Sequence, residues 1–209
     1  MDPVARYVTS AYQDLFGRSP DPSGLQAWTG LLRQGMDRAA VARSITSSTE
    51  YRSRLITGAY REFLGREPDP AGLAGWLAAM GGGLTIQGLE SGFIASPEYY
   101  AKAGGTDGSW VRQLYRHVLG RDAAGAEVQA WVGALAAGGS RYAVAMGFVL
   151  STERLATVID GYYTAFLRRP IDPVGRQAWV AAVQGGVRTE EIIAGILASN
   201  EYFELSQSL

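Results

Sequence analysis

The chain has no cysteine and only one histidine among its 209 residues. Without thiols it cannot form a disulfide framework, a thiolate zinc site or a cysteine nucleophile. It carries 19 basic and 20 acidic side chains, so its formal net charge is −1. A chain this close to neutrality lacks the basic field that holds nucleic acid or an anionic membrane. We therefore expect no nucleic-acid partner, and a ligand has to be recognised by a local group of side chains.

Long hydrophobic runs are also missing, although 47% of the residues are hydrophobic. No apolar segment approaches the roughly 18 residues of a membrane helix, so we expect no membrane insertion. Residues 1–12 show neither the basic start nor the apolar centre of a signal peptide. Runs that alternate β-branched and polar residues are absent, which argues against strands. The composition predicts an all-α fold with a substantial core.

Four similar segments recur along the chain, and each places an arginine ten residues before a tryptophan. The tryptophans are Trp28, Trp76, Trp131 and Trp179, and the arginines are Arg18, Arg66, Arg121 and Arg169. Four glutamates, each two residues after a serine, keep the same spacing: Glu50, Glu98, Glu153 and Glu201. Because successive tryptophans lie 48, 55 and 48 residues apart, the sequence predicts four tandem helical repeats of about 48 residues.

The first repeat shows how its helices are delimited. Apolar residues recur at steps of three and four over residues 4–16, which predicts one helix. Asp21 and Pro22 suit the N-cap and first turn of a second helix, and Gly35 suits its end. Asp37 is then placed to cap a short third helix.

A serine opens the closing helix of every repeat. These N-caps are Ser48, Ser96, Ser151 and Ser199. Few helix breakers follow within 49–64 or 152–167, so there the closing helix is predicted to run into the next repeat. Between the second and third repeats, seven extra residues at 103–109 interrupt this continuity. We therefore divide the chain into a first pair of repeats (1–102), a glycine-rich insertion (103–109) and a second pair (110–209), as in a duplicated pair.

These motifs resemble a bacterial domain family of unknown function, numbered 4214. The shared features are a tyrosine, Leu-Gly-Arg, a Pro-Asp-x-x-Gly-Leu turn, the tryptophan and a closing Ser-x-Glu-Tyr. The tyrosines here are Tyr12, Tyr60, Tyr115 and Tyr163, and the closing pairs are Glu50-Tyr51, Glu98-Tyr99 and Glu201-Tyr202. The resemblance covers nearly the whole chain and implies a helical domain of secreted or surface proteins. An extracellular or cell-surface location follows from it, and no catalytic residue is implied.

The third and fourth repeats depart from this pattern. In the third, Ala124 replaces the turn aspartate, Glu127 the glycine, and Arg154 the tyrosine after the closing glutamate. In the fourth, Arg168 stands for glycine and Arg176 for leucine. A function that requires every motif residue would therefore not be present four times.

The repeated residues are interpreted as structural. The tryptophans have aliphatic neighbours at helical spacing, which indicates core positions. The arginines are expected to pair with the Ser-x-Glu carboxylates in buried or half-buried clamps. Each Asp-Pro turn offers one carboxylate where calcium needs several oxygens, so we assign no metal and no cofactor.

His117 stands where the other repeats carry unrelated residues, which indicates an exposed helical position. A triad of His117 with Ser109 and Asp107 is the catalytic alternative. Four aromatic residues fall outside the repeat pattern and are therefore candidate binding residues: Trp110, Tyr100, Tyr142 and Tyr162. For Trp110, the alternative is a lid on the core of the second half.

The sequence favours a noncatalytic interaction module, which adheres or anchors to a glycan or a protein of the cell envelope. One alternative is a polysaccharide hydrolase or transferase with Glu50, Glu98 and Glu201 as acid and base. The other is a structural spacer that self-associates into homo-oligomers.

Overall fold

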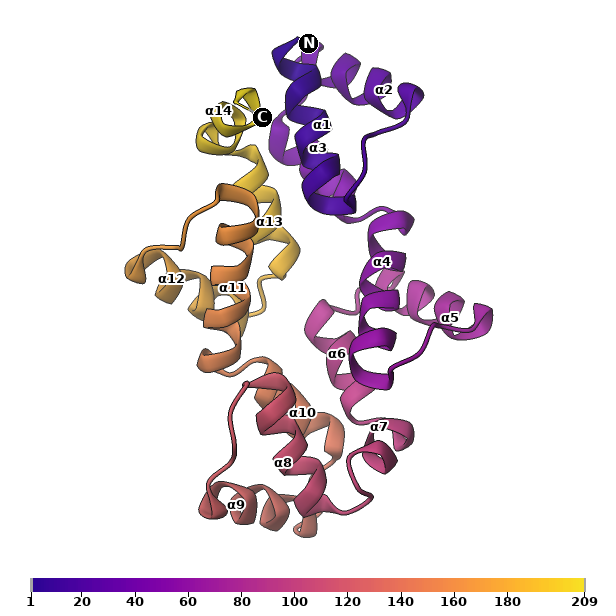
Figure 1. The fold of residues 1–209 in the computed structure, drawn as a ribbon, viewed down its shortest axis with the longest axis vertical. Helices are drawn as coiled ribbons and strands as arrows, with labels where there is room; N and C mark the ends of the chain where they lie inside the picture. Colours follow the sequence, from indigo (N-terminus) through magenta and orange to yellow (C-terminus); the bar gives the residue numbers. More distant parts are fainter. Residues whose placement is uncertain (1, 209) are drawn as a thin grey trace. The chain divides into compact units, whose positions relative to one another are not determined.

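The fold was obtained as a computed structural model that describes residues 2–208. These residues form fourteen α-helices and one π-helical turn, and they contain no strand (Figure 1). The prediction of an all-α fold is therefore confirmed.

Each repeat contributes an opening, a second, a third and a closing helix. The elements of the first two repeats are α1 (Pro3–Phe16), α2 (Pro22–Arg33), α3 (Arg38–Thr46), α4 (Thr49–Ala59), η1 (Tyr60–Leu64), α5 (Pro70–Gly81), α6 (Ile86–Ile94) and α7 (Pro97–Lys102). Those of the last two are α8 (Asp107–Val118), α9 (Gly125–Ala136), α10 (Arg141–Val149), α11 (Thr152–Leu167), α12 (Pro173–Gln184), α13 (Thr189–Ala198) and α14 (Asn200–Gln207).

The helix starts are fixed by the side chains that the sequence indicated. Asp21, Asp69 and Asp172 each accept a hydrogen bond from the backbone N–H three residues later, at 2.8 Å. The four serine caps accept from the N–H groups of Tyr51, Tyr99, Arg154 and Tyr202 at 3.1 to 3.2 Å. These caps satisfy donors that a helix start leaves without partners, so local chemistry sets the boundaries.

Two helices cross repeat boundaries, as predicted. α4 continues into the π-helical turn η1, and α11 runs without a break through residues 152–167. Between the second and third repeats α7 and α8 are separate helices, because Gly104 and Gly105 adopt positive φ angles of 101° and 67° there. The insertion therefore interrupts the helix where the sequence indicated.

The chain forms two compact units. The ranges Met1–Arg54 and Thr157–Leu209 make up one, here called the terminal unit, and Leu55–Ala156 makes up the other, the middle unit. The terminal unit thus pairs the first repeat with the fourth, where α3 packs against α13. The middle unit pairs the second repeat with the third, where α6 packs against α10. These units do not coincide with the sequence halves 1–102 and 110–209.

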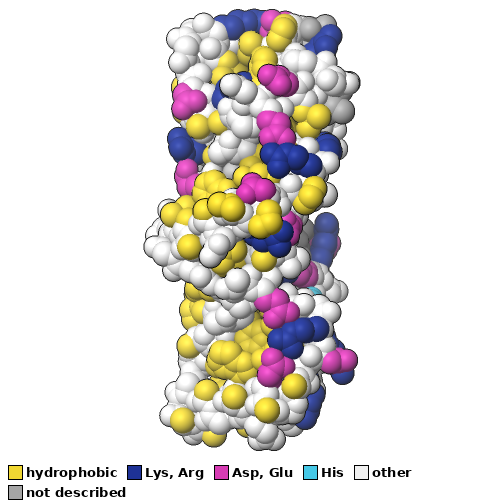
Figure 2. All heavy atoms as spheres, turned by 90° about the vertical axis from the view of Figure 1, so that its left-hand side faces the viewer, with side chains coloured by type: hydrophobic (Ala, Val, Ile, Leu, Met, Phe, Trp, Pro, Cys, Tyr) yellow, Lys and Arg dark blue, Asp and Glu magenta, His cyan; other side chains and the backbone are white. Residues whose placement is uncertain are grey.

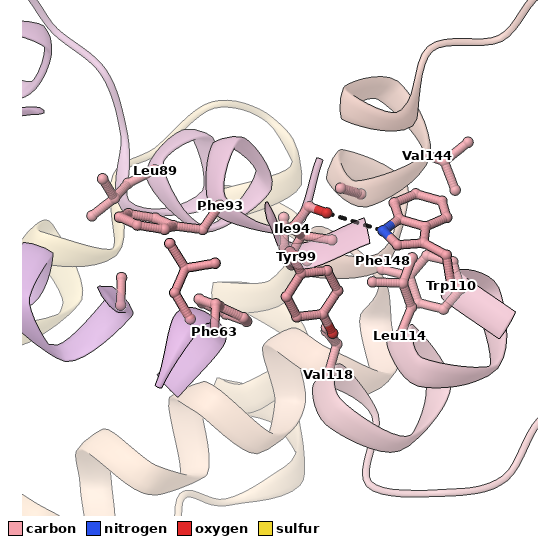
Figure 3. Packing of buried hydrophobic residues seen from close by; sticks show 14 of the residues in the cluster. Phe63, Leu89, Phe93, Ile94, Tyr99, Trp110, Leu114, Val118, Val144 and Phe148 are labelled. Atoms are coloured by element: carbon pink, nitrogen blue, oxygen red, sulfur yellow. Dashed lines mark hydrogen bonds between the residues drawn. The ribbon is translucent and has the colours of Figure 1, made fainter. Parts of the chain in front are cut away.

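A continuous aromatic and aliphatic cluster fills the middle unit (Figure 3). Trp110 lies within it, fully buried, and donates its indole N–H to the Ile94 carbonyl at 3.0 Å. Phe63 stacks on Phe93 with ring centroids 6.4 Å apart, and Tyr99 meets Phe63 edge-on. Burial of large rings in such mutual contact dominates the stability of a domain this small.

The repeat tryptophans are half-buried and lie at the margin of each core. The prediction that they pack against the core is confirmed, but their rings remain partly exposed to solvent. In three repeats the indole N–H donates to the tyrosine hydroxyl sixteen residues earlier: Trp28 to Tyr12, Trp131 to Tyr115 and Trp179 to Tyr163, at 2.9, 3.2 and 3.2 Å. A ring that keeps its polar edge near the surface explains the partial exposure.

Each repeat arginine pairs with the glutamate 32 residues later, which confirms the predicted pairing. The pairs are Arg18–Glu50, Arg66–Glu98, Arg121–Glu153 and Arg169–Glu201. Their side chains are 37% to 50% exposed, so the clamps lie at the surface and are half-buried at most. The guanidinium also lies over the repeat tyrosine, as for Arg121 at 4.8 Å from the Tyr115 ring. The face in Figure 2 shows the same mixture of charges, with basic and acidic side chains next to one another.

Candidate functional site

Two of the four candidate aromatic residues meet at one place in the middle unit. Tyr142 lines an open depression of about 400 Å³, and Tyr100 lies at its edge in contact with two lining residues. The remaining lining residues are Ala95, Asp107, Leu135, Gly139 and Arg141.

Helix starts hold the polar groups of this depression. Asp107 is in the first turn of α8, and Arg141 and Tyr142 are the first two residues of α10. Ser140 caps α10 by accepting the Ala143 N–H at 3.1 Å. Because both turns are fixed by backbone hydrogen bonds, the carboxylate, the guanidinium and the phenol project from rigid elements.

Tyr100 connects Asp107 with Arg141. Its hydroxyl donates to Asp107 Oδ1 at 3.1 Å, and the Arg141 guanidinium lies 4.1 Å from its ring centroid. Desolvation and the hydrogen bond to Asp107 raise the pKa of Tyr100, so the phenol stays a donor at neutral pH. Within residues 2–208 neither Asp107 nor Arg141 has an ion-pair partner. Both charged groups therefore retain capacity for a ligand.

Tyr142 is the exposed aromatic group of the depression. Its exposed fraction is 43%. Among the described residues, the large hydrophobic side chains that are exposed include one aromatic residue, and this is Tyr142. An open aromatic face beside a carboxylate and a guanidinium combines apolar contact with donors and acceptors, as small-molecule sites do. The arrangement suits a ligand with both C–H faces and hydroxyl groups.

The prediction of Trp110 as a binding residue is wrong. Its exposed fraction is 0%, so a ligand cannot reach it. It is buried, as the alternative expected, but inside the core shared by the second and third repeats and not as a lid on the second half. It also occupies the repeat position of Tyr7, which precedes it by 103 residues and is 2% exposed. Trp110 therefore belongs to the duplicated pattern that it had been thought to break.

Tyr162 lies in α11 in the terminal unit and is half-buried, with its ring 6.4 Å from that of Phe166. It does not line the depression. The structure therefore joins Tyr100 and Tyr142 in one site and leaves Tyr162 outside it.

His117 is half-buried, so its prediction as an exposed residue is wrong. Its Nδ1 lies 3.1 Å from the Tyr99 hydroxyl, and its ring packs 5.1 Å from Phe63. Ser109 is bonded to Thr106 at the start of α8, so the described residues do not assemble the triad that the sequence left open. His117 helps to join the second and third repeats.

The repeated glutamates are held by arginine, not placed across a cleft from one another. Hydrogen bonding to Arg66 lowers the pKa of Glu98, and hydrogen bonding to Arg169 lowers that of Glu201. A carboxylate held ionised is poorly suited to act as a general acid. No group of three or more potential metal-ligating His, Cys, Asp or Glu side chains occurs within the described chain.

Among the helices of residues 2–208, none alone has the length and hydropathy to cross a bilayer; α10 and α11 pass only as a bent pair.

Comparison with protein families agrees with the repeat pattern. The model of the domain of unknown function DUF4214 matches residues 4–55, 52–102 and 90–158. The chain belongs to the DUF4214 family. No curated protein and no solved structure matches it. The DUF4214 matches end before the fourth repeat, in which Arg168 and Arg176 replace motif residues.

Sequence reasoning missed Arg141 of this depression, and it considered Asp107 only as a member of a catalytic triad. The repeat spacing could have identified Arg141. Arg38 lies 103 residues before it, and Phe203 lies 103 residues after Tyr100, so an arginine and an aromatic residue occupy equivalent positions in both units. In the terminal unit Arg38 lies 4.9 Å from the Phe203 ring centroid, which repeats the contact of Arg141 with Tyr100. Asp107 has no acidic counterpart, since the equivalent residue is Val4.

Proposed function

We propose that this chain is a noncatalytic interaction module of the bacterial cell exterior, which binds carbohydrate of the cell envelope. The observation that supports it is the open face of Tyr142, 43% exposed, beside Asp107 and Arg141 in one depression. Extended surfaces built by helical repeats commonly serve recognition.

The chemistry of the depression matches a sugar. The Tyr142 ring offers an apolar face to the C–H side of a pyranose. Asp107 accepts from sugar hydroxyls with the oxygen that Tyr100 does not use. Arg141 donates, and its stacking on Tyr100 fixes the guanidinium before the ligand arrives.

A noncatalytic role is favoured over a polysaccharide-active enzyme. A glycosidase needs one carboxyl that stays protonated until it donates, opposite a second that stays ionised. The repeated glutamates all pair with arginine at the protein surface, and these hydrogen bonds lower the pKa of Glu98 and of Glu201. These contacts resemble structural clamps that repeat with the fold.

A glycan array and pull-down with envelope polysaccharide test the proposal. Wild-type protein is expected to bind, and Tyr142→Ala is expected to weaken binding by about tenfold or more, because a stacking contact is lost. Met36→Ala is the matched control, since Met36 is 38% exposed and lies in the terminal unit. It should bind as the wild type does.

Three outcomes would contradict the proposal. Failure to retain any glycan or envelope material would remove its basis, and unchanged binding by Tyr142→Ala would remove its site. Release of reducing ends from a bound polysaccharide would favour the enzyme instead. Light scattering that shows concentration-dependent oligomers, without any ligand binding, would favour the self-associating spacer.

A further inference from the structure

The terminal unit has a pocket of its own, at the end of α3 and the start of α13. Its volume is about 220 Å³. This equals about seven waters of bulk liquid, enough for one small polar group or sugar ring. The charged residues that line it are Arg43, Arg52, Arg188, Glu190 and Glu191, and three hydroxyl side chains of α3 and its C-cap complete the wall.

The charges of this pocket do not cancel. Arg43 pairs with Glu191 and Arg188 with Glu190, each at 2.8 Å. Arg52 is half-buried, and within residues 2–208 it has no carboxylate partner. Three guanidinium groups thus face two carboxylates, and the cation left over is fixed on α4 at the pocket wall.

The same wall also offers acceptors. Oε2 of Glu190 is buried and has no hydrogen-bond partner within the described residues. The hydroxyls of Ser44 and Ser47 donate to backbone carbonyls at 2.9 and 3.2 Å, so only their lone pairs face outward. A ligand that matches both the unpaired guanidinium and these acceptors carries one negative group and, next to it, hydroxyl groups that donate hydrogen bonds.

The pocket occupies the same place in the repeat as the depression of the middle unit. Ser47 corresponds to Ala95, and Arg52 to Tyr100, with a difference of 48 in residue number. Glu190 likewise corresponds to Tyr142, with the same interval. Each site lies where the third helix of one repeat ends beside the start of its partner's third helix. The fold therefore builds one kind of junction and lines it with charge in one unit and with aromatic rings in the other.

We infer that this pocket is a second binding site, which takes an acidic sugar of the uronic acid class. The sugar carboxylate pairs with Arg52, and its hydroxyls donate to Glu190 and to the serine hydroxyls. This inference does not require the middle-unit depression to bind a glycan, because the two sites share no residue.

Titration of the full chain, followed by heteronuclear NMR and calorimetry, tests the inference. The probes are D-glucuronate, D-glucose, acetate and inorganic phosphate. Glucuronate is expected to shift the signals of residues 43–52 and 188–191, and glucose is expected to leave the signals of these residues unchanged. Arg52→Gln should weaken glucuronate binding about tenfold, as loss of a charged hydrogen bond does.

Controls separate a site effect from a general one. Arg112→Gln removes an exposed arginine of α8 in the middle unit and should leave the glucuronate-induced shifts at residues 43–52 and 188–191 as in the wild type. Arg52→Lys keeps the charge and should retain part of the affinity. The inference is overturned if glucuronate does not bind, if Arg52→Gln binds it equally well, or if acetate or phosphate binds as tightly as glucuronate.

Discussion

The two units place an arginine over an aromatic ring at the same repeat positions, yet the arginines are used differently. In the terminal unit Arg38 lies over Phe203 and also donates to Asn200 Oδ1 at 2.5 Å. In the middle unit Arg141 lies over Tyr100 and faces a depression. The scaffold thus fixes the stacked pair, while its neighbours decide whether the guanidinium bonds within the protein or stays open to a ligand.

A second difference concerns the residue after the closing glutamate. It is a buried tyrosine in three repeats, Tyr51, Tyr99 and Tyr202, and in the third repeat it is Arg154. Arg154 lies 3.5 Å from Glu90, and both side chains are 18% exposed. Burial raises the pKa of Glu90, and the charge of Arg154 opposes that rise. A charged pair thus stands in the middle unit where the terminal unit has Tyr51 and Ile193, without a change of fold.

The largest predicted effect comes from the core position shared by Trp110 and Tyr7. Trp110→Ala is expected to lower the free energy of unfolding by about 3–5 kcal/mol, because a buried ring leaves a cavity. Trp131→Ala should cost less, since Trp131 is half-buried. Trp110→Tyr copies the terminal unit and should cost least. Urea denaturation measures the free energy of unfolding of the three variants. Equal decreases for Trp110→Ala and Trp131→Ala would contradict the assignment of Trp110 to the core and of Trp131 to its margin.

The next effect concerns the charged pair of the middle unit. Arg154→Met is expected to cost about 3 kcal/mol at neutral pH, because Glu90 is left buried without its cation. Arg154→Tyr with Glu90→Ile copies Tyr51 and Ile193 of the terminal unit and should recover most of the loss. Stability from urea denaturation that is equal in the single and double variants would contradict this account.

The same pair predicts a pH dependence. The folded-state pKa of Glu90 is raised above its ordinary value of 4.5. Its contribution is therefore fully present below pH 4.5 and is lost as the pH rises through the folded-state pKa. Removal of Arg154 extends this loss to higher pH, so Arg154→Met should be relatively more stable in mild acid. Denaturation across a pH series checks the sign.

A smaller effect is expected at the helix caps. Asp69→Ala should destabilise by about 1 kcal/mol, because the Gly72 N–H loses its acceptor. The third repeat has Ala124 at this position, and there Glu127 accepts the Ala124 N–H instead, at 2.8 Å. Ala124→Asp should bring little gain, because a carboxylate at position 124 would lie next to the Glu127 carboxylate that is held there. Thermal unfolding compares the two variants, and a large gain would show that the reversed cap is inadequate.

The third-repeat cap also has a predicted response to acid. Hydrogen bonds from Arg121, and then from the Ala124 N–H, lower the pKa of Glu127 to about 2. This contribution is present above pH 4.5 and is lost as the pH falls toward 2. Glu127→Gln should remove that part of the acid sensitivity, as acid titration followed by circular dichroism would show.

The surface clamps give the smallest effect. Arg66→Gln is expected to leave the urea midpoint of unfolding almost unchanged, because the pair with Glu98 is largely exposed and screened. Arg121→Gln should cost more, since Arg121 holds both Glu127 and Glu153. Similar losses in denaturation would mean that the added partner contributes nothing.

Features set by neighbouring residues were predictable from the sequence. The Asp21 and Ser48 caps, the continuous helix α11 and the arginine–glutamate pairs all depend on short-range chemistry or on strict spacing. The association of the first repeat with the fourth was not predictable. The repeats have similar apolar faces, so the sequence of one face does not show which other repeat packs against it. For the same reason Asp107 could not be placed beside Tyr142, since it belongs to another helix.

The order of the repeats along the chain has a consequence for synthesis. Residues 55–156 hold every part of the middle unit, so that unit is complete as soon as they have left the ribosome. The first repeat emerges earlier but lacks its partner until the fourth has been translated, on the order of ten seconds later at about 5–20 residues per second. During that interval the apolar side of α3 has no α13 to cover it. Of the four repeats, the first is therefore the one that a nascent-chain chaperone would hold longest.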